Sequence, residues 1–392
     1  MICYRNVSSF CLSRSVIFRK FKYKFISLNH SELHCKIALS FLSGIGPRKA
    51  ARLLSTVGSA EAIFLESLTT LHRLSGIPKE VLRSMKRESA LSLADMHVNY
   101  MLKHNISVYF YLDSDYPRRL KHCADAPILL YGRGKNELNA PRMVSVVGTR
   151  NASAYGSGLC ESFLHELIGK DITVVSGMAY GVDICAHKYC VRFGIPTIGV
   201  LGHGPDRIYP HVHQRTAEQM MEHGGVLTEF LPGTKPDREN FPMRNRIVAG
   251  MTDATIVIES KKSGGSLITA ELANDYNKDV FAFPGNVGQT LSEGCNHLIR
   301  QQKAHLITSA EDFLTFMNWN DIPNQGVQRT IFNELDQEER NICSMLTAPQ
   351  GEHIDVLSAK TGLAISALNV RLFHLEMKGV IKPLPGSRYR LI

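Results

Sequence analysis

The 392-residue sequence lacks any apolar run that approaches the ~18 residues a membrane-spanning helix requires. It also lacks a Cys-x-x-Cys pair, and its nine cysteines show no regular spacing, which argues against a disulfide framework. Irregular cysteines in a chain of this length are typical of a reducing compartment. We therefore expect reduced thiols, a cytoplasmic location and no membrane partner.

Standard motifs for catalysis and cofactor binding are missing as well. Neither G-x-G-x-x-G nor G-x-x-x-x-G-K-[S/T] occurs, so nothing indicates a dinucleotide or a triphosphate site. His203, His211 and His213 do not have the spacing of a standard zinc site. Asp183 and His187 lie one helical turn apart and could form an acid–base pair, although such a pair more often stabilises the structure. We expect no metal, no cofactor and no enzymatic activity.

Acidic residues are scarce at the N-terminus, where no acid precedes Glu32 and six lysines and arginines occur. A basic, serine-containing and acid-free stretch is typical of a transit peptide. A disordered extension, or a start codon assigned too far upstream, explains the same composition, and we favour this interpretation for a basic tail over residues 1–30. The whole chain has a formal net charge of +9, which favours an anionic partner such as nucleic acid only weakly by itself.

The length indicates two or three domains, and the first of them, over residues 31–105, has apolar residues at helical spacing. The segment SGIGPRKAARLL within it, with Gly44 and Gly46, is typical of a helix-hairpin-helix. Backbone N–H groups at the start of such a helix can hold a phosphate, and Lys49 and Arg52 could assist. A tight turn between helices with a solvated basic face is the alternative.

Residues 106–313 alternate between short apolar segments and helix-like stretches. The apolar segments are ISVYFYL, MVSVVG, ITVVSG, PTIGVLG, GGVLTEF, ATIVIES and DVFAFPG. Continuous apolar runs of this length indicate strands that are buried on both faces, and therefore an α/β domain with a mostly parallel sheet between helices. Ligands of such folds bind beyond the carboxyl ends of the strands.

The last part of the chain shows a polar stretch at 314–336, which we interpret as a linker, and a small unit at 337–392. The unit contains three helical patterns followed by two short strands around a Pro-Gly turn, which is the order of a winged helix. Its third helix, SALNVRLFHLEMKG, carries Arg371 and Lys378 as its only firm cations. It could contact duplex DNA or, at least as readily, another protein.

Glycines, hydroxyls and arginines gather where the expected strands end. Small residues let the backbone approach an anion, and Arg150 in VVGTRNASAYG offers a planar fork to a phosphate. SGMAYGVDICAH and ESKKSGGSLITAELA provide two further glycine turns at helix starts. Each of these turns could equally be structural, but several in a row suit a chain of phosphates better than one small molecule.

The segment NFPMRNRIVAG adds a ring and two cations. Pro242 restricts the chain after Phe241, which could stack on a base or pack in the core. Arg244 and Arg246 are two residues apart and so do not share one face. We expect one arginine to reach a phosphate and the other to brace a neighbouring loop, and Asn245 could brace the local turn.

VVGTRNASAYG, SGMAYGVDICAH, VLGHGPDRIYP, FPMRNRIVAG, GGSLITAELA and FPGNVGQTLSEGCNHLI follow one another in an order and spacing that closely resembles the DNA-processing protein A (DprA/Smf) family. The resemblance covers about residues 107–309. It implies an extended Rossmann-like domain that binds single-stranded DNA, protects incoming DNA during natural transformation and promotes loading of the recombinase RecA. It also implies a homodimer and no enzymatic turnover.

The resemblance assigns DNA contact by position in these motifs. The residues concerned are Arg150, Ser153, Ser176, Gly177, Phe241, Arg244, Asn245, Arg246, Lys262, Gly264, Gly265 and Ser266. The chain departs from the family pattern at Tyr180, where an arginine is common, and at Ser263, where a basic residue is common. Both departures remove a possible cation from the DNA site.

Two other classes of function compete with this interpretation. Nucleotide hydrolases of the lysine decarboxylase-like phosphoribohydrolase group carry PGGxGTxxE. The corresponding SGGSLITAE contains the glycine pair and Glu271, but it lacks the leading proline and has a different spacing. A pure interaction scaffold, in which the glycine turns are only structural, is the third class.

Overall fold

The computed structural model describes residues 32–320, 335–346, 351–378 and 380–391. The expected basic tail at 1–30 and most of the expected linker at 314–336 therefore lie outside the described residues. The chain divides into two units, Met1–Asn318 and Trp319–Ile392.

The first unit begins with short helices that follow the helical pattern of the sequence. They are α2 (Glu32–Ala38), η1 (Leu39–Phe41), α3 (Pro47–Val57), α4 (Ala60–Leu65), α5 (Leu68–Ser75), α6 (Lys79–Arg83) and α7 (Arg87–Lys103). Pro47 occupies the first turn of α3, where its missing N–H has no helical acceptor, and Gly58 ends α3 in a left-handed conformation with φ 82°. The side chains of Ser59 and Ser67 cap α4 and α5.

The nine strands of the central sheet are β1 (Ser107–Phe110), β2 (Leu129–Gly134), β3 (Arg142–Val147), β4 (Ile172–Gly177), β5 (Thr197–Val200), β6 (Gly225–Thr228), β7 (Ala254–Val257), β8 (Asp279–Ala282) and β9 (His305–Leu306). Their order is β1-β2-β6-β5-β4-β3-β7-β8-β9. The pairs β1–β2 and β2–β6 are antiparallel, and all other neighbours are parallel. The expectation of a mostly parallel α/β sheet is confirmed. The seven strands expected from apolar runs are all present, and β2 and β9 are additional.

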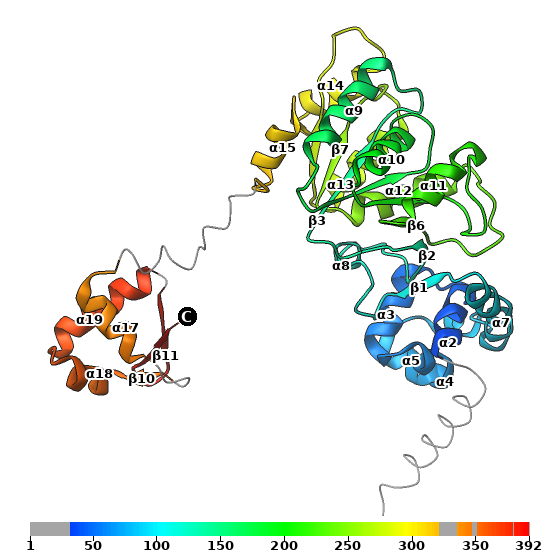
Figure 1. The fold of residues 1–392 in the computed structure, drawn as a ribbon. Coiled ribbons are helices and arrows are strands. Elements are labelled where there is room, and N and C mark those ends of the chain that lie inside the picture. Colours follow the sequence, from blue (N-terminus) through cyan, green and yellow to red (C-terminus); the bar gives the residue numbers. More distant parts are fainter. Residues whose placement is uncertain (1–31, 321–334, 347–350, 379, 392) are drawn as a thin grey trace, which may run out of the picture. The chain divides into compact units, whose positions relative to one another are not determined.

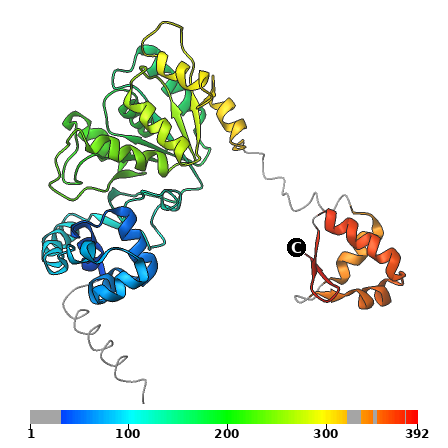
Figure 2. The same ribbon diagram turned by 180° about the vertical axis from the view of Figure 1, so that it is seen from behind.

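The helices of this sheet are α8 (Arg118–Lys121), α9 (Ala154–Glu166), α10 (Val182–Phe193), η2 (His211–His213), α11 (Gln214–Met220), α12 (Asn240–Gly250), α13 (Gly265–Asp275), α14 (Glu293–Arg300) and α15 (Ala310–Phe316). α10 packs between α9 and α11, whereas α12 packs against α13. The sheet thus lies between two helical layers (Figures 1 and 2). α15 extends to Phe316, inside the range that the sequence assigned to a linker.

The helical region is continuous with the antiparallel edge of the sheet. Its core contains the buried side chains of Ile37, Leu53 and Leu71, and the same core includes Phe110 of β1 and Tyr131 of β2. A second core lies between the sheet and the helices α12 to α14. The two antiparallel strands therefore carry the helical region, and the parallel strands carry the glycine-rich loops.

The second unit is a winged helix, as the order of its elements predicts. It consists of α17 (Gln337–Met345), β10 (Glu352–His353), α18 (Ile354–Thr361), α19 (Ile365–Met377), β11 (Ile381–Leu384) and β12 (Arg388–Leu391). Its sheet has the order β10-β12-β11. Ile342, Leu357, Leu372 and Ile381 bring together all three helices and the sheet in one core.

Within the described parts of the chain, no single helix is long and apolar enough to cross a membrane. Only the pair α18 and α19, bent by 107° at the break between them, meets that test jointly.

Candidate nucleic-acid interface

A cleft of about 550 Å³ opens where the direction of the sheet topology changes. The chain runs outward from β3 through β4, β5 and β6, and then returns to β7 on the opposite side of β3. The loops that follow β3 and β7 therefore leave the sheet in different directions, and ligands of α/β folds bind in the crevice between such loops. The loop after β4 and one face of α12 complete the walls.

The stretch NFPMRNRIVAG forms α12 in its entirety, including the Phe-Pro step. Pro242 lies in the first turn, where its missing N–H does not interrupt the helix. Phe241, Arg244, Asn245 and Val248 line the cleft, and their spacing of three and four residues places them on one helical face. The helical period therefore places Phe241, Arg244 and Asn245 side by side on the face of α12 that lines the cleft.

Phe241 separates the cleft from a second hollow of about 420 Å³. The guanidinium carbon of the exposed Arg150 lies 5.3 Å from the centre of the Phe241 ring. On the side of the second hollow, the Tyr209 ring centre lies 6.4 Å from that of Phe241, with the two rings inclined by 34°. Arg150 and Phe241 line both hollows, so a ligand could pass from one to the other along them.

The second hollow has aromatic walls and one unpaired polar atom. Tyr180 and Tyr209 are about half exposed and line it. The side chain of His203 also lines it, and its Nε2 atom is buried and has no hydrogen-bond partner among the residues that the structure describes. Burial lowers the pKa of His203, so the ring is neutral near pH 7.

Arg244 forms part of the cleft floor and is only 4% exposed. Its Nη1 donates to the carbonyl oxygen of Val200, and its Nε donates to Asn245 Oδ1 at 3.2 Å. Burial lowers the pKa of Arg244, and the negative charge of Asp183 opposes this effect. Burial raises the pKa of Asp183, and the charge of Arg244 again opposes. The two groups stabilise each other's charged form beneath the cleft.

Gly177 allows these two groups to occupy the end of β4. A methyl group at this position would collide with the guanidinium of Arg244 and the carboxylate of Asp183. The glycine is therefore required by close packing around a buried charge pair, and φ at this residue is not positive.

Arg246 lies on the other side of α12 and does not line the cleft. Its Nη2 forms an ion pair with the carboxylate of Glu229, and its Nη1 donates to the carbonyl oxygen of Asp125 at 2.6 Å. These partners come from the loops after β6 and before β2. Arg246 thus braces α12, and the two-residue spacing of the arginines puts only Arg244 at the cleft.

Ser153 and Ser176 face the interior of the protein. Ser153 caps α9, and its hydroxyl donates to Glu259 Oε1 at 2.6 Å. The backbone N–H of Ser153 donates to Glu259 Oε2 at 3.0 Å, so the start of α9 holds an internal carboxylate. Ser176 is fully buried and donates to the carbonyl oxygen of Val146 at 2.6 Å. Neither hydroxyl lines the cleft.

The start of α13 does face the cleft. Gly264, Gly265 and Ser266 line it, and the first turn of α13 contains no acidic side chain. The hydroxyl of Ser266 donates to Ser260 Oγ at 2.9 Å, so Ser266 offers its backbone more readily than its side chain. Backbone N–H groups at the start of a helix are favourable partners for an anion.

Several cleft residues were not among those assigned from the sequence. The exposed Arg238 lines both hollows, and the exposed Lys261 lines the first, whereas Lys262 lines neither. Thr149, Asn151 and Thr269 also line the cleft. Arg238 is separated from the FPMRNR segment by Glu239 and Asn240, which hides its relation to it. Lys261 and Lys262 are chemically equivalent neighbours, and only the backbone path distinguishes them.

Other candidates from the sequence have structural roles. Nε2 of the buried His187 lies 2.7 Å from the carbonyl oxygen of Gly177, and its Nδ1 lies 2.8 Å from Thr197 Oγ1, so His187 does not pair with Asp183. Within the described ranges, no cluster of three or more His, Cys, Asp or Glu side chains could hold a metal ion. In the helix-hairpin-helix, Lys49 donates to the carbonyl oxygen of Gly44 at 3.0 Å.

The glutamate required by the hydrolase interpretation lies outside both hollows. Glu271 is exposed, and one of its oxygens is 3.6 Å from the ammonium nitrogen of Lys303. The cleft therefore lacks the carboxylate that the alternative function would use.

Comparisons with known proteins give matches in all three regions of the described chain. A family model for DNA recombination-mediator protein A matches residues 107–318, one for the DprA winged helix domain matches 333–387, and one for a SAM-like helix-hairpin-helix tandem matches 37–89. Protein Smf of Synechocystis is 32% identical over 312 residues, which cover 71% of this chain and 78% of that protein. DNA processing protein DprA of Streptococcus pneumoniae is 41% identical over 203 residues, covering 52% of this chain and 71% of that protein.

Solved structures give the same result. The crystal structure of DprA from Streptococcus pneumoniae superimposes with a TM-score of 0.61 at 35% identity, and the match covers 71% of this chain and 95% of that one. DprA from Helicobacter pylori, whose structure concerns its mode of binding single-stranded DNA, superimposes with a TM-score of 0.50 at 27% identity. That match covers 54% of this chain and 95% of the Helicobacter chain.

Proposed function

Because this chain belongs to the DprA/Smf family of DNA-processing proteins, we propose that its cleft binds single-stranded DNA and that the protein acts as a recombination mediator. The observation that carries the proposal is the contact of Arg150 with Phe241 at the boundary of the two hollows. Proteins that bind single strands combine cations for the phosphates with rings on which bases stack. This contact supplies both groups at one place.

The phosphates have several partners in the cleft. Arg150, Arg238 and Lys261 are exposed cations at its rim. The start of α13 adds backbone N–H groups without a competing acid. Arg244 contributes a fixed positive charge from below, where its position is set by Val200 and Asn245. A phosphate backbone would therefore lie between the loop after β3 and the start of α13.

The bases of the bound strand would lie away from the phosphate contacts, on Phe241 and in the second hollow. One base would stack on the exposed part of Phe241, and its neighbour would enter the second hollow between Tyr180 and Tyr209. His203 Nε2 would then form a hydrogen bond with a base edge, which removes the unpaired buried atom. Phosphate contacts and stacking carry little sequence information, so we expect binding to tolerate most sequences.

The wider biological role follows from the same family relationship. We include in the proposal protection of incoming DNA during natural transformation, promotion of RecA loading, homodimer formation and a cytoplasmic location. The description of the matching family as a recombination mediator supports a recombinase partner. Light scattering after size exclusion tests the dimer, and a RecA strand-exchange assay on coated single strands tests the loading.

The test of the cleft is a fluorescence anisotropy titration with labelled poly-dT and with a duplex, each at several salt concentrations. We expect tight binding to poly-dT that weakens steeply with salt, because lysines and arginines displace counterions from phosphates. Arg150→Ala should lower both the affinity and the salt dependence. Wild-type affinity and salt dependence in this variant, with an unchanged unfolding temperature, would contradict the proposal.

The hydrolase alternative has its own experiment, although the geometry does not favour it. Release of base from nucleoside monophosphates, abolished by Glu271→Gln, would support an enzyme. We expect no release above the background of a protein-free control, since Glu271 lies away from the cleft.

A further inference from the structure

One face of the small sheet in the winged-helix unit is cationic. The register pairs Lys382 with Arg390 and Leu384 with Arg388 across β11 and β12, and Arg388 with His353 across β12 and β10. Side chains alternate between the two faces of a sheet, so these five residues share one face. The other face, with Ile381 and Leu391, packs on the core of the unit.

The cations on this outer face lack acidic partners. Lys382 and Arg390 are both exposed and lie directly opposite each other, and like charges in this position destabilise a strand pair. In the part of the chain that the structure describes, neither forms an ion pair with an acid. Arg388 is also exposed and donates through Nη1 to the carbonyl oxygen of Gly351 at 3.1 Å. The repulsion between these groups would be relieved by an anion from outside the unit.

Two acids lie in or beside β10, and neither pairs with Lys382, Arg388 or Arg390. Asp355 lies at its edge, 3.4 Å from Nδ1 of His353. Glu352 projects from β10 to the opposite side, where it pairs with Lys360 at 3.3 Å. Lys382, Arg388 and Arg390 therefore remain a positive strip along β11 and β12.

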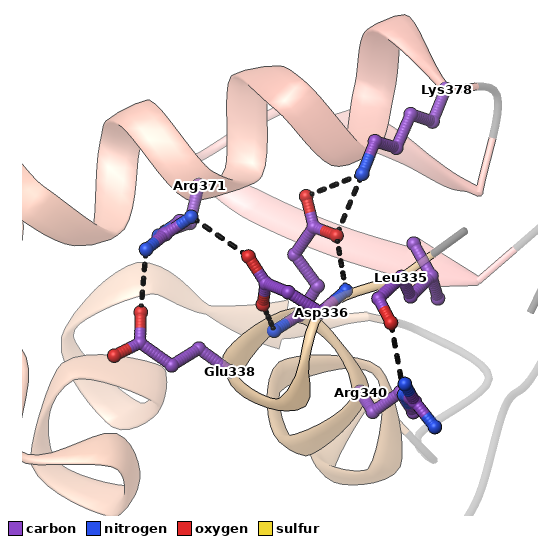
Figure 3. Close-up of polar contacts among 7 residues, drawn as sticks. Leu335, Asp336, Glu338, Arg340, Arg371 and Lys378 are labelled. Carbon is purple, nitrogen blue, oxygen red and sulfur yellow. Dashed lines mark hydrogen bonds and ion pairs between the residues drawn. The ribbon is translucent and has the colours of Figure 1, made fainter. Parts of the chain in front are cut away.

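In many winged helices the third helix contacts DNA. Here the lysine and the arginine of that helix region form ion pairs within the unit. Arg371 donates to Asp336 at 3.0 Å and to Glu338 at 2.8 Å, both at the start of α17 (Figure 3). Lys378 donates to the two carboxylate oxygens of the buried Glu339 at 2.9 and 2.7 Å. Arg371 of α19 and Lys378 at its C-terminal end are thus both paired with acids at the start of α17.

Besides polar residues such as Asn369 and Glu376, α19 exposes large apolar side chains. Val370 is 55% exposed and Phe373 is 59% exposed. A helix with these side chains and no uncommitted lysine or arginine lacks the phosphate contacts that would hold it in a DNA groove.

We propose that the winged-helix unit binds the phosphate backbone of single-stranded DNA through Lys382, Arg388 and Arg390 on the outer face of its sheet, and not through α19. This inference rests on the proposed function of the cleft, because a strand held there is tethered to the same chain and meets the wing at a high effective concentration. Arg388 and Arg390 are roughly 7 Å apart along the strand, which suits neighbouring phosphates of an extended backbone. Beside the partly exposed His353 imidazole, the described residues of this face carry no ring, so the strip contributes mainly charge.

The test uses the full chain and long poly-dT, with Lys382→Gln/Arg390→Gln as the main variant. If each cation contacts one phosphate, the slope of log K against log salt should fall by about 1.4, and affinity near 0.1 M salt by roughly tenfold. Lys360→Gln is the matched control, because Lys360 is a cation of the same unit that pairs with Glu352, and it should bind as wild type. Arg371→Gln should also leave the slope unchanged.

The variant Lys382→Glu distinguishes a loss of DNA affinity from a loss of hairpin stability. It places opposite charges across β11 and β12, so the hairpin should be at least as stable as in the wild type. DNA binding should nevertheless weaken more than in Lys382→Gln. Loss of binding together with a lower unfolding temperature would contradict the inference.

The outcomes distinguish the wing from the cleft. If Arg150→Ala weakens binding and Lys382→Gln/Arg390→Gln does not, the wing inference fails and the proposed function stands. If wild-type protein does not bind poly-dT, the proposed function itself fails. A larger loss on duplex than on poly-dT, or loss of binding to a protein partner alone, would overturn the assignment of single-stranded DNA to this face.

Discussion

The guanidinium of Arg150 lies over the ring of Phe241, 5.3 Å from its centre, and this contact links the loop after β3 to the first turn of α12. A cation above a ring at a partly exposed site stabilises by about 0.5–1 kcal/mol. The contact fixes the direction of the ring while the arginine keeps N–H groups for a phosphate. In the proposed function, two motifs far apart in the sequence would thereby act as one DNA-binding element.

Replacing the ring should reduce affinity without changing the salt dependence. We expect Phe241→Ala to weaken poly-dT binding by about 1–3 kcal/mol, or roughly 5- to 150-fold, because a stacked base is lost. A ring displaces no counterions, so the slope against salt should stay as in the wild type. Met243→Ala, in the same turn but outside both hollows, is the control and should bind normally. A changed slope in Phe241→Ala would mean that the ring positions phosphates instead of stacking.

The adjacent lysines after β7 should behave differently. Lys261 lines the cleft and Lys262 does not, although both are exposed. We expect Lys261→Ala to lower the slope of log K against log salt by about 0.7, corresponding to one phosphate of a single strand. Lys262→Ala should bind as wild type in the same anisotropy titration. Equal effects of the two substitutions would indicate only a diffuse contribution of charge.

An acid at the start of α13 should oppose DNA while favouring the helix. Gly265 is exposed, and a side chain there would meet open space. Gly265→Asp should stabilise the helix by about 0.3–1 kcal/mol through the helix dipole, yet weaken poly-dT binding severalfold because it repels phosphate. Gly265→Asn, of the same shape, should bind better than the aspartate variant. If the two variants bind equally, the start of α13 does not contact phosphate.

Gly177 should be intolerant of a methyl group. Gly177→Ala places Cβ against the Arg244 guanidinium and the Asp183 carboxylate, and we expect a loss of about 1–3 kcal/mol in the free energy of unfolding. Gly158→Ala in α9 meets no atom within 4 Å and should stabilise by roughly 0.5–1 kcal/mol. Denaturant unfolding measures both. A neutral Gly177→Ala variant would show that the charge pair can rearrange.

Stability should fall as the pH is lowered through the range in which His187 becomes charged. Burial lowers the pKa of His187 to about 4, and the nearby charge of Arg244 acts in the same direction. Between this value and the ordinary pKa of about 6.5, the unfolded chain binds the proton and the folded chain does not. Stability attributable to His187 is therefore fully present above about pH 6.5 and is lost progressively towards pH 4, with a limit of about 3 kcal/mol.

The variant His187→Gln isolates this contribution, since glutamine does not titrate. Its free energy of unfolding should depend less steeply on pH between 6.5 and 4 than that of the wild type. Parallel curves for the two proteins would assign the pH dependence to other groups.

Much of the architecture follows from local patterns in the sequence. Short continuous apolar runs predict the seven main strands, because strands covered on both faces have no polar side to expose. The helical period of α12 separates Arg244 from Arg246. The sequence did not predict β2, because its segment LLYGRG contains two glycines and an arginine and resembles a loop. Its strand form depends on pairing with β1 and β6.

The tertiary structure decided which polar residues face the cleft. Ser153 is turned inward by Glu259, which lies 106 residues away, and Arg246 is held by Glu229 on the loop after β6. Likewise, Arg371 and Lys378 are matched by acids of α17 rather than left for DNA. A motif specifies residue types and spacing, whereas the direction of each side chain depends on partners that only folding brings close. The sequence alone therefore determined the family, seven strands of the central sheet and the helix with the ring and the arginines, and long-range ion pairs determined which cations remain available to a nucleic acid.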